Sequence, residues 1–302
     1  MRYLTAAMLL ILATLFNPLT RAEAAEPGPA QPGKQRIVSI GGDVTEILVA
    51  LGMGNEIVGV DSTSKFPSAA LEGKPDVGYM RALSAEGVLS LGPTAIFATK
   101  SSGPPEAVRA LKSSSVKFVE IPDEHSPDGI LEKITRIAEA TGQKAEAQEL
   151  TNSLQHAFED LDEKRSRIAK RQRVLFVLNA SGDRMIVGGK GTGAEVALAL
   201  AGADNAAASV TGYKPITPEG LVSMAPDAIV VMSGGRPGDG ASQLAKRSAV
   251  QMTPAGTPSE AKIRKMDGSY LIGFGPRTPN AVRELMTWLY PDIERTNAGG
   301  KS

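Results

Sequence analysis

The sequence predicts an α/β protein of two Rossmann-like lobes with parallel sheets, joined by a long connecting α-helix and separated by a ligand cleft. Three observations lead to this prediction. Apolar strand-like runs alternate with helical segments in both halves of the chain, the stretch between them is helical throughout, and a segment of the first half recurs in the second. Alternation of strands and helices is typical of parallel sheets that helices cover on both faces.

The first half shows this alternation clearly. Continuous apolar runs predict buried strands at 35–40, 56–61, 95–99 and 116–121. Helices are expected between them at 44–51, 84–91 and 105–112. The first helix follows a turn that starts at Gly41. The second starts at a Ser84 cap and has Glu86 in its first turn, where the helix dipole favours an acid. Together these elements predict an N-terminal lobe over residues 35–127.

The middle of the chain has a different texture. From Asp128 to about Arg173 it offers no strand candidate, and it is rich in Glu, Lys, Ala, Gln and Leu. Apolar residues recur there at helical spacing, as between Leu150 and Leu161. One break is expected at Thr141-Gly142. We therefore predict a connecting helical segment over residues 128–172.

The strand and helix rhythm restarts in the last part of the chain. Strands are expected at 173–178 and 228–232, and helices at 193–201, 219–224, 240–250 and 279–289. An early helix of each half carries a related pattern, TEILVALG from Thr45 and AEVALALAG from Ala194. We therefore expect a C-terminal lobe over residues 173–302 that is built like the first.

The N-terminus has the pattern of a secretory signal. Arg2 supplies a positive charge, residues 6–16 form a short apolar run, and Ala22-Glu23-Ala24 is a small-x-small cleavage site. We predict a signal peptide over 1–24 and a flexible Pro/Gly-rich leader over 25–34. The sequence contains no cysteine, so it offers neither a disulfide nor a lipidated cysteine as a membrane anchor. Export without an anchor favours the periplasm as the location.

The composition argues against several classes of function. The 33 basic and 33 acidic residues balance, so nothing favours a nucleic-acid backbone as partner. The two histidines, His125 and His156, do not make the ligand set of a zinc site, and no Gly-x-Ser-x-Gly motif is present. The glycine-rich run at 188–193 lacks the Ser or Thr that a phosphate-binding loop carries directly after Gly-Lys. We expect a monomeric protein that is not an enzyme, with His156 in solvent and His125 near the cleft.

A duplicated segment carries the residues of greatest chemical interest. GYMRALSAEGVLSLGPTAI starts at Gly78 and GYKPITPEGLVSMAPDAI at Gly212, and eleven positions from Glu86 and Glu219 align without a gap. In each copy a tyrosine follows the first glycine and has a cation close by: Tyr79 with Arg81, and Tyr213 with Lys214. The pattern also fits surface tyrosines that only pack against the protein.

Tyrosine next to a cation suits the chemistry of ferric iron. A phenolate is a hard anionic ligand, and tyrosine serves as an axial ligand of haem iron. Ionising a free tyrosine at pH 7 costs roughly 4 kcal/mol, because its pKa is near 10. Ferric iron and a neighbouring guanidinium both favour the charged form. Arg and Lys also suit the two propionates of a haem.

Four segments together resemble a known family: RIVSIGGDVTEILVALG, VGYMRALSAEGVLSLGPTAI, GGKGTGAEVALALAGADNAA and GYKPITPEGLVSMAPDAIVV. They are similar to the haem-binding periplasmic proteins of bacterial haem ABC importers, over about residues 36–290. The resemblance implies a carrier that binds ferric haem b and delivers it to an ABC permease dimer of the inner membrane. It implies Tyr79 as the axial ligand of the haem iron, with Arg81 on the phenolate or on a propionate. Lys214 would reach the ligand from the second lobe, and Tyr213 is the alternative partner.

The resemblance also gives the repeated glutamates a role. In related binding proteins an acidic residue on each lobe docks into a basic pocket of a two-fold symmetric permease, and Glu86 and Glu219 match those positions. Both glutamates also suit the positive end of a helix dipole, which is a purely structural reason for their presence.

Other cargoes and an enzymatic function stay open at this point. A corrinoid or ferric-siderophore carrier would make Tyr79 incidental to binding. A tetrapyrrole chelatase would need a histidine and carboxylates together in the cleft, and no histidine follows His156.

Overall fold

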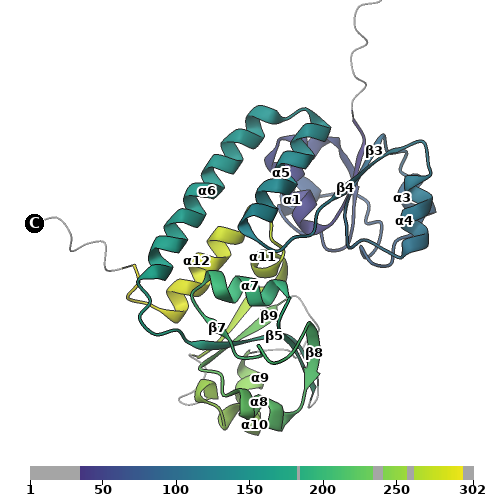
Figure 1. The fold of residues 1–302 in the computed structure, drawn as a ribbon. Helices are drawn as coiled ribbons and strands as arrows, with labels where there is room; N and C mark the ends of the chain where they lie inside the picture. Colours follow the sequence, from purple (N-terminus) through teal and green to yellow (C-terminus); the bar gives the residue numbers. More distant parts are fainter. Residues whose placement is uncertain (1–34, 182–183, 234–240, 257–261, 295–302) are drawn as a thin grey trace, which may run out of the picture. The chain divides into compact units, whose positions relative to one another are not determined.

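The computed structural model describes residues 35–181, 184–233, 241–256 and 262–294, all within one compact unit that spans Gln35–Ser302 (Figure 1). The predicted signal peptide and leader, residues 1–34, lie outside the described residues. None of the helices in the described part of the chain combines the length and the apolar character that a membrane span requires.

The first lobe is built on a four-stranded sheet in which every strand runs parallel to its neighbours. Its order is β2 (Ile57–Val60), β1 (Ile37–Ile40), β3 (Ala95–Thr99), β4 (Lys117–Ile121). These four strands confirm the predicted ones. The central strands β1 and β3 are buried along their whole length, as a sheet covered on both faces requires. The helices of this lobe are α1 (Gly42–Ala50), η1 (Met53–Glu56), α2 (Ser68–Leu71), α3 (Ala85–Leu89) and α4 (Pro105–Lys112).

The second lobe contains a mixed sheet, so the prediction of a wholly parallel sheet was wrong for this lobe. Its order is β10 (Ile263–Asp267), β9 (Ala228–Ser233), β5 (Arg173–Ser181), β6 (Arg184–Gly188), β8 (Tyr213–Ile216), with β7 (Asp204–Asn205) beside β5. β10, β9 and β5 are parallel, whereas β6 is antiparallel to both β5 and β8. The prediction missed β6, β7, β8 and β10. The two edge strands carry charged or exposed residues, and β8 contains a proline, which sheets tolerate at an edge.

Short helices surround this second sheet. The predicted helix 240–250 is two helices, α9 (Ala241–Ala245) and α10 (Ser248–Gln251), and position 240 lies outside the described residues. The helices of this lobe are α7 (Gly193–Leu200), α8 (Pro218–Met224), α9 (Ala241–Ala245), α10 (Ser248–Gln251), η2 (Pro254–Gly256), α11 (Gly268–Ile272) and α12 (Thr278–Leu289).

Two helices, rather than one, connect the lobes. α5 (Pro127–Thr141) and α6 (Lys144–Ser166) lie side by side in Figure 1. The break falls where the sequence predicts it, because Gly142 takes a left-handed conformation with φ 83° that ends α5. Ser126 caps the start of α5, because its hydroxyl accepts a hydrogen bond from the Gly129 N–H at 2.9 Å.

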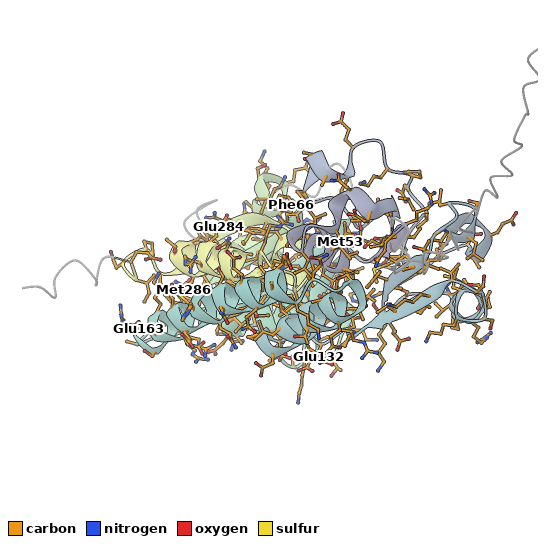
Figure 2. The ribbon with its side chains drawn as sticks, turned by 90° about the horizontal axis from the view of Figure 1, so that it is seen from above. Met53, Phe66, Glu132, Glu163, Glu284 and Met286 are labelled. Atoms are coloured by element: carbon orange, nitrogen blue, oxygen red, sulfur yellow. The ribbon has the colours of Figure 1, made fainter. Side chains whose placement is uncertain are left out.

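The helical layer belongs to one hydrophobic core that extends into both lobes. Buried side chains of α1, α5, α6, α7 and α12 all contribute to it, among them Ile134, Phe158, Leu198 and Leu285. Two smaller clusters cover the other faces of the two sheets. On the opposite side of the helical layer, Glu132 of α5 and Glu163 of α6 point away from this core (Figure 2). The connecting helices therefore act as a shared wall of both lobes.

The shared core predicts a large loss of stability when one of its side chains is shortened. Ile134 is fully buried, so we expect Ile134→Ala to lower the free energy of unfolding by about 2–5 kcal/mol. The matched control is Glu132→Ala on the exposed side of the same helix, which should change it by less than about 0.5 kcal/mol. Urea unfolding followed by circular dichroism measures both. Equal effects of the two variants would contradict a shared core at α5.

Candidate ligand-binding site

A cavity of about 560 Å³ lies where the carboxyl ends of the strands of both sheets meet. Open α/β sheets bind ligands at this edge, and the volume falls within the range of small-molecule sites. Both lobes contribute to the lining: Gly42, Asp43, Ser62, Thr63, Lys65, Tyr79, Met80, Arg81, Thr99, Ser101, Asp123 and His125 from the first, and Leu178, Tyr213, Met232, Ser233, Asp267, Gly268, Ser269, Ile272 and Gly273 from the second.

Tyr79 and Arg81 lie on a tight turn that backbone hydrogen bonds hold in place. The Ala82 N–H donates to the Tyr79 carbonyl at 2.7 Å, and the Gly103 N–H donates to the Met80 carbonyl at 2.9 Å. The turn starts at Gly78, whose φ of 94° favours glycine. Hydrogen bonds thus fix the backbone of this turn, while Tyr79 itself is 48% exposed and lines the cavity.

Tyr213 faces the same cavity from the second lobe, at the start of β8. Its ring packs closely on Gly188, where an added Cβ would come within 3.2 Å of Cε1. Burial raises the pKa of Tyr213 above its ordinary value of 10.0, against hydrogen bonds with the Ala194 backbone and the Thr192 side chain and the positive charge of Arg81. Arg81 therefore acts electrostatically on a tyrosine of the opposite lobe, and the predicted trio of Tyr79, Arg81 and Tyr213 shares one cavity.

Lys214, the cation of the second copy, has a different setting from Arg81, the cation of the first. It follows Tyr213 on β8, and successive side chains of a strand point to opposite faces of the sheet. It is exposed and does not belong to the residues that line the cavity. The cations of the two copies thus have different settings, because Arg81 lies on a turn and Lys214 lies on a strand. Ligand binding by Lys214 stays a prediction.

His125 also lines the cavity, close to Asp123 and to the second lobe. Its Nε2 lies 3.9 Å from Asp123 Oδ1, and its ring centroid lies 5.0 Å from that of Phe274. Burial lowers the pKa of His125 below its ordinary value of 6.5, although the Asp123 carboxylate opposes this, so the imidazole is mainly neutral at pH 7. His156 is exposed on α6 beside Glu159, as predicted.

The sequence reasoning missed Lys65, Asp43 and Asp267 as cavity residues. Lys65 follows β2, Asp43 lies in the first turn of α1 just after β1, and Asp267 ends β10. A signal was therefore present, because the carboxyl ends of parallel strands meet at one edge of a sheet. Lys65 adds a second cation to Arg81, and neither side chain has an ion pair within the described residues. Four apolar side chains supply broad walls between the polar groups, namely Met80, Leu178, Met232 and Ile272.

The repeated glutamates have equivalent positions in the two lobes. Ser84 caps α3 by accepting a hydrogen bond from the Gly87 N–H at 3.2 Å, and Thr217 caps α8 from the Gly220 N–H at 3.1 Å. Glu86 and Glu219 are each the second residue of the capped helix, and both are exposed. Backbone and Thr217 hydrogen bonds lower the pKa of Glu219. The duplicated sequence thus presents one exposed carboxylate on each lobe.

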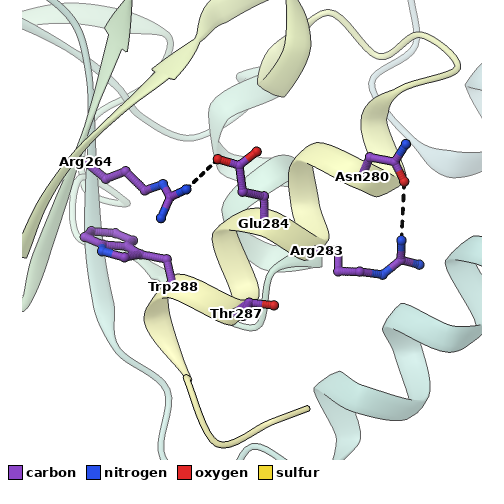
Figure 3. A pocket seen from close by; sticks show the side chains of 6 residues that line it. All are labelled: Arg264, Asn280, Arg283, Glu284, Thr287 and Trp288. Atoms are coloured by element: carbon purple, nitrogen blue, oxygen red, sulfur yellow. Dashed lines mark hydrogen bonds and ion pairs between the residues drawn. The ribbon is translucent and has the colours of Figure 1, made fainter.

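A second hollow, of about 440 Å³, lies on the outer side of α12 (Figure 3). Its charged side chains already have partners: Arg264 pairs with Glu284 at 2.5 Å and lies 5.9 Å from the Trp288 ring, and Arg283 pairs with Asp160 at 3.2 Å. It draws its lining from one lobe only. The cavity between the two sheets is therefore the better candidate for a ligand.

Two lobes with facing strand ends, a cavity between them and a shared helical wall define the class of two-lobed ligand-binding proteins. The chain belongs to the Periplasmic binding protein family, whose sequence profile matches residues 37–259.

Two solved structures show the same fold with substantial identity. The periplasmic heme-binding protein RhuT from Roseiflexus sp. RS-1, in apo form, is 35% identical with a TM-score of 0.81, over 86% of this chain and 100% of that one. The periplasmic heme-binding protein HutB of Vibrio cholerae is 36% identical with a TM-score of 0.76, over 85% of this chain and 100% of that one.

Curated relatives cover most of the chain as well. The uncharacterized ABC transporter substrate-binding lipoprotein YvrC of Bacillus subtilis is 30% identical over 261 residues, which is 85% of this chain and 81% of that protein. A vitamin B12-binding protein of Vibrio cholerae is 25% identical over 284 residues, which is 92% of this chain and 96% of that protein.

The environment of Tyr213 predicts its behaviour at alkaline pH. Because the folded protein raises its pKa, the phenol contributes stability that is present below about pH 10 and is lost as the pH rises through the folded pKa. Tyr213→Phe should therefore lose less stability in alkali than the wild type. In an absorbance titration it should lack one phenolate step above pH 10. A missing step at or below pH 10 would contradict the description of this site.

Proposed function

We propose that this protein binds ferric haem b in the cavity and delivers it to an ABC permease dimer of the inner membrane, without catalysing a reaction. The observation that carries the proposal is that Tyr79, Arg81 and Tyr213 line one cavity from two lobes. The family, and the names of RhuT and HutB as periplasmic heme-binding proteins, support it.

Tyr79 is the proposed axial ligand of the iron, because it lines the cavity, is about half exposed and lies on a hydrogen-bonded turn. Arg81 follows two residues later on the same turn, where its positive charge favours the phenolate. Tyr213 is less suited to ligation, since its burial raises its pKa and so opposes formation of the phenolate. We assign it to the second wall of the cavity.

The rest of the cavity suits a flat apolar molecule with two carboxylates. Met80, Leu178, Met232 and Ile272 offer apolar contact to a macrocycle. Arg81 and Lys65 are the cations that line the cavity, and they suit propionates.

The proposed location is the periplasm, after cleavage of the signal peptide, and the proposed form is a monomer. The Periplasmic binding protein family supports an exported protein. Determining the N-terminal residue of the protein isolated from the periplasm tests this directly. A mature chain that still begins at Met1 would contradict it.

The alternative function is that of a carrier for a corrinoid or a ferric siderophore. The vitamin B12-binding relative favours the corrinoid. One observation also supports a tetrapyrrole chelatase, because His125 and the Asp123 carboxylate both line the cavity. Incubation with protoporphyrin and ferrous iron separates these readings, since a carrier should not accelerate metal insertion and a chelatase should.

The first prediction from this proposal concerns the iron ligand. Titration of the ligand-free protein with ferric haem should give a saturating Soret band with high-spin charge-transfer features. Tyr79→Phe should lose those features and weaken binding by at least about tenfold, or 1.4 kcal/mol. Arg81→Ala should keep Tyr79 as the iron ligand and bind haem more weakly. Lys214→Ala serves as a comparison from outside the cavity.

Two outcomes of this titration would change the assignment. An unchanged spectrum in Tyr79→Phe would move the iron ligand to Tyr213 or His125. No saturable change with the wild type would reject haem as the cargo and leave corrinoids and siderophores to be screened.

The second prediction concerns delivery to the permease, for which Glu86 and Glu219 are the proposed docking residues. We expect the Glu86→Ala, Glu219→Ala double variant to bind haem normally and to stimulate the ATPase of the reconstituted transporter about tenfold less, because rim charges chiefly govern encounter. Glu106→Ala is the matched control, an exposed acid in the first turn of α4. Wild-type stimulation by the double variant would reject the docking role.

A further inference from the structure

A short segment of the second lobe is inserted against the first lobe beneath the cavity. It consists of Gly273, Phe274, Gly275, Pro276 and Arg277, links α11 to α12, and is called the wedge below. Phe274 is fully buried and has a φ of 51°, a left-handed conformation that costs free energy for a bulky residue. Such a conformation persists only where the surroundings hold it.

The surroundings of the wedge are charged side chains of the first lobe and of α5. Lys133 of α5 is completely buried, and its Nζ lies 2.5 Å from Asp43 Oδ2 and 3.2 Å from the Phe274 carbonyl oxygen. One lysine thus joins α1, α5 and the wedge. A fully buried lysine needs such partners, because an unpaired buried charge is strongly destabilising.

A second ion pair joins the other end of the wedge to α1. The Arg277 Nε donates to Glu46 Oε2 at 3.0 Å, and its Nη2 donates to Glu46 Oε1, which makes the pair bidentate. Glu46 is only 7% exposed. Burial raises the pKa of Glu46, whereas hydrogen bonds and charge from Arg277 lower it. The guanidinium thus compensates a carboxylate that would otherwise lie unpaired in the first lobe.

Aromatic rings hold the same guanidinium from two further directions. The Arg277 Cζ lies 3.7 Å from the ring centroid of Phe66 and 5.1 Å from that of Tyr270. Phe66, which is labelled in Figure 2, belongs to the first lobe, and Tyr270 to the second. Arg277 is therefore held between the lobes by charge, by hydrogen bonds and by cation–π contacts.

The wedge contacts are connected to the cavity, although their ion-pairing cations lie outside it. Asp43 and Gly273 line the cavity, and His125, another lining residue, packs on Phe274. Lys133 and Arg277 are not among the lining residues. A change at these two cations would move the walls of the cavity without removing a group that contacts the ligand.

We propose that the wedge positions the two walls of the cavity relative to each other, with the Asp43–Lys133 and Glu46–Arg277 pairs as its fastenings. Arg277 and Lys133 are then positioning residues, which set how long a ligand stays in the cavity. The inference rests on the proposed function only for the choice of haem as a probe.

The first test needs no ligand. Because the sequence contains no cysteine, Ser90→Cys at the end of α3 and Ser223→Cys in α8 place one spin label on each lobe, at exposed positions. Double electron–electron resonance should give a narrow distance distribution in this background. Adding Arg277→Gln should broaden or shift it, because the pair and the stacking are lost.

Arg283→Gln is the matched control for that measurement. Arg283 lies on α12, the helix that follows Arg277 directly. It pairs with Asp160 of α6, away from the cavity. It should leave the distribution narrow. If the distribution with Arg277→Gln matches that with Arg283→Gln, the proposal is overturned, whatever the cargo is.

The second test follows the release of ferric haem to apomyoglobin. We expect Arg277→Gln to release haem roughly tenfold to a hundredfold faster, because the two walls are no longer held around the ligand and changes of affinity at one site act mostly on the dissociation rate. Its Soret band should be unchanged, because Tyr79 and Arg81 are intact. Release at the wild-type rate would overturn the positioning role. Should the wild type bind no haem, the spin-label test still decides the proposal.

Phe66→Leu decides the question if Arg277→Gln does not fold. It removes the ring that stacks on the guanidinium and leaves every charge paired. We expect a change in the same direction and of smaller size in both the distance distribution and the release rate. Wild-type values in both measurements would overturn the proposal.

Discussion

The structure depends on the shared burial of apolar side chains between the two lobes and the connecting helices. The core that includes Ile134, Phe158, Leu198 and Leu285 extends from the first sheet through α5 and α6 to α7 and α12. The helical layer covers one face of each sheet, so both lobes share it. Because packed interiors deform little, this layer restricts how far the lobes move relative to each other. The carboxyl ends of both sheets are consequently held facing one cavity.

Polar interactions complete what the apolar layer begins. Next to the core, Lys133 and Arg277 join the wedge to the carboxylates of α1, and above them the loops that follow the strands line the cavity. The apolar layer gives most of the free energy, since burial of apolar area is the dominant favourable term. The ion pairs add orientation, because a bidentate pair tolerates only a narrow range of geometries. The cavity therefore lies on a support that is both tightly packed and directionally fixed.

The duplicated segment shows how similar sequences acquire different roles. Ser84 and Thr217 cap their helices in the same way and present Glu86 and Glu219 at equivalent positions. Ahead of the caps the copies diverge. Tyr79 lies on a tight turn, whereas Tyr213 begins an edge strand. The same approximate symmetry thus gives two matching exposed faces and a cavity whose two walls differ in their tyrosines.

The amino-acid sequence by itself determined the features that depend on near neighbours. These are the buried strands of the first lobe, the Ser84 cap, the break at Gly142 and the tyrosines that open the two repeats. Each follows from hydrophobic periodicity, capping or glycine conformation within a few residues. The cations Arg81 and Lys214 show the limit of such local prediction, because similarity between the two copies does not tell a turn from a strand.

Only the tertiary structure decided what depends on distant partners. The edge strands β8 and β10 form because a neighbouring strand supplies their hydrogen bonds, although charged or exposed residues interrupt their apolar pattern. Strand alternation then places Tyr213 in the cavity and leaves Lys214 outside it. The Glu46–Arg277 pair joins residues 231 positions apart, and no local pattern announces it. Long-range pairing of charges and strands is a property of the assembled lobes, and for that reason it was visible only in the folded chain.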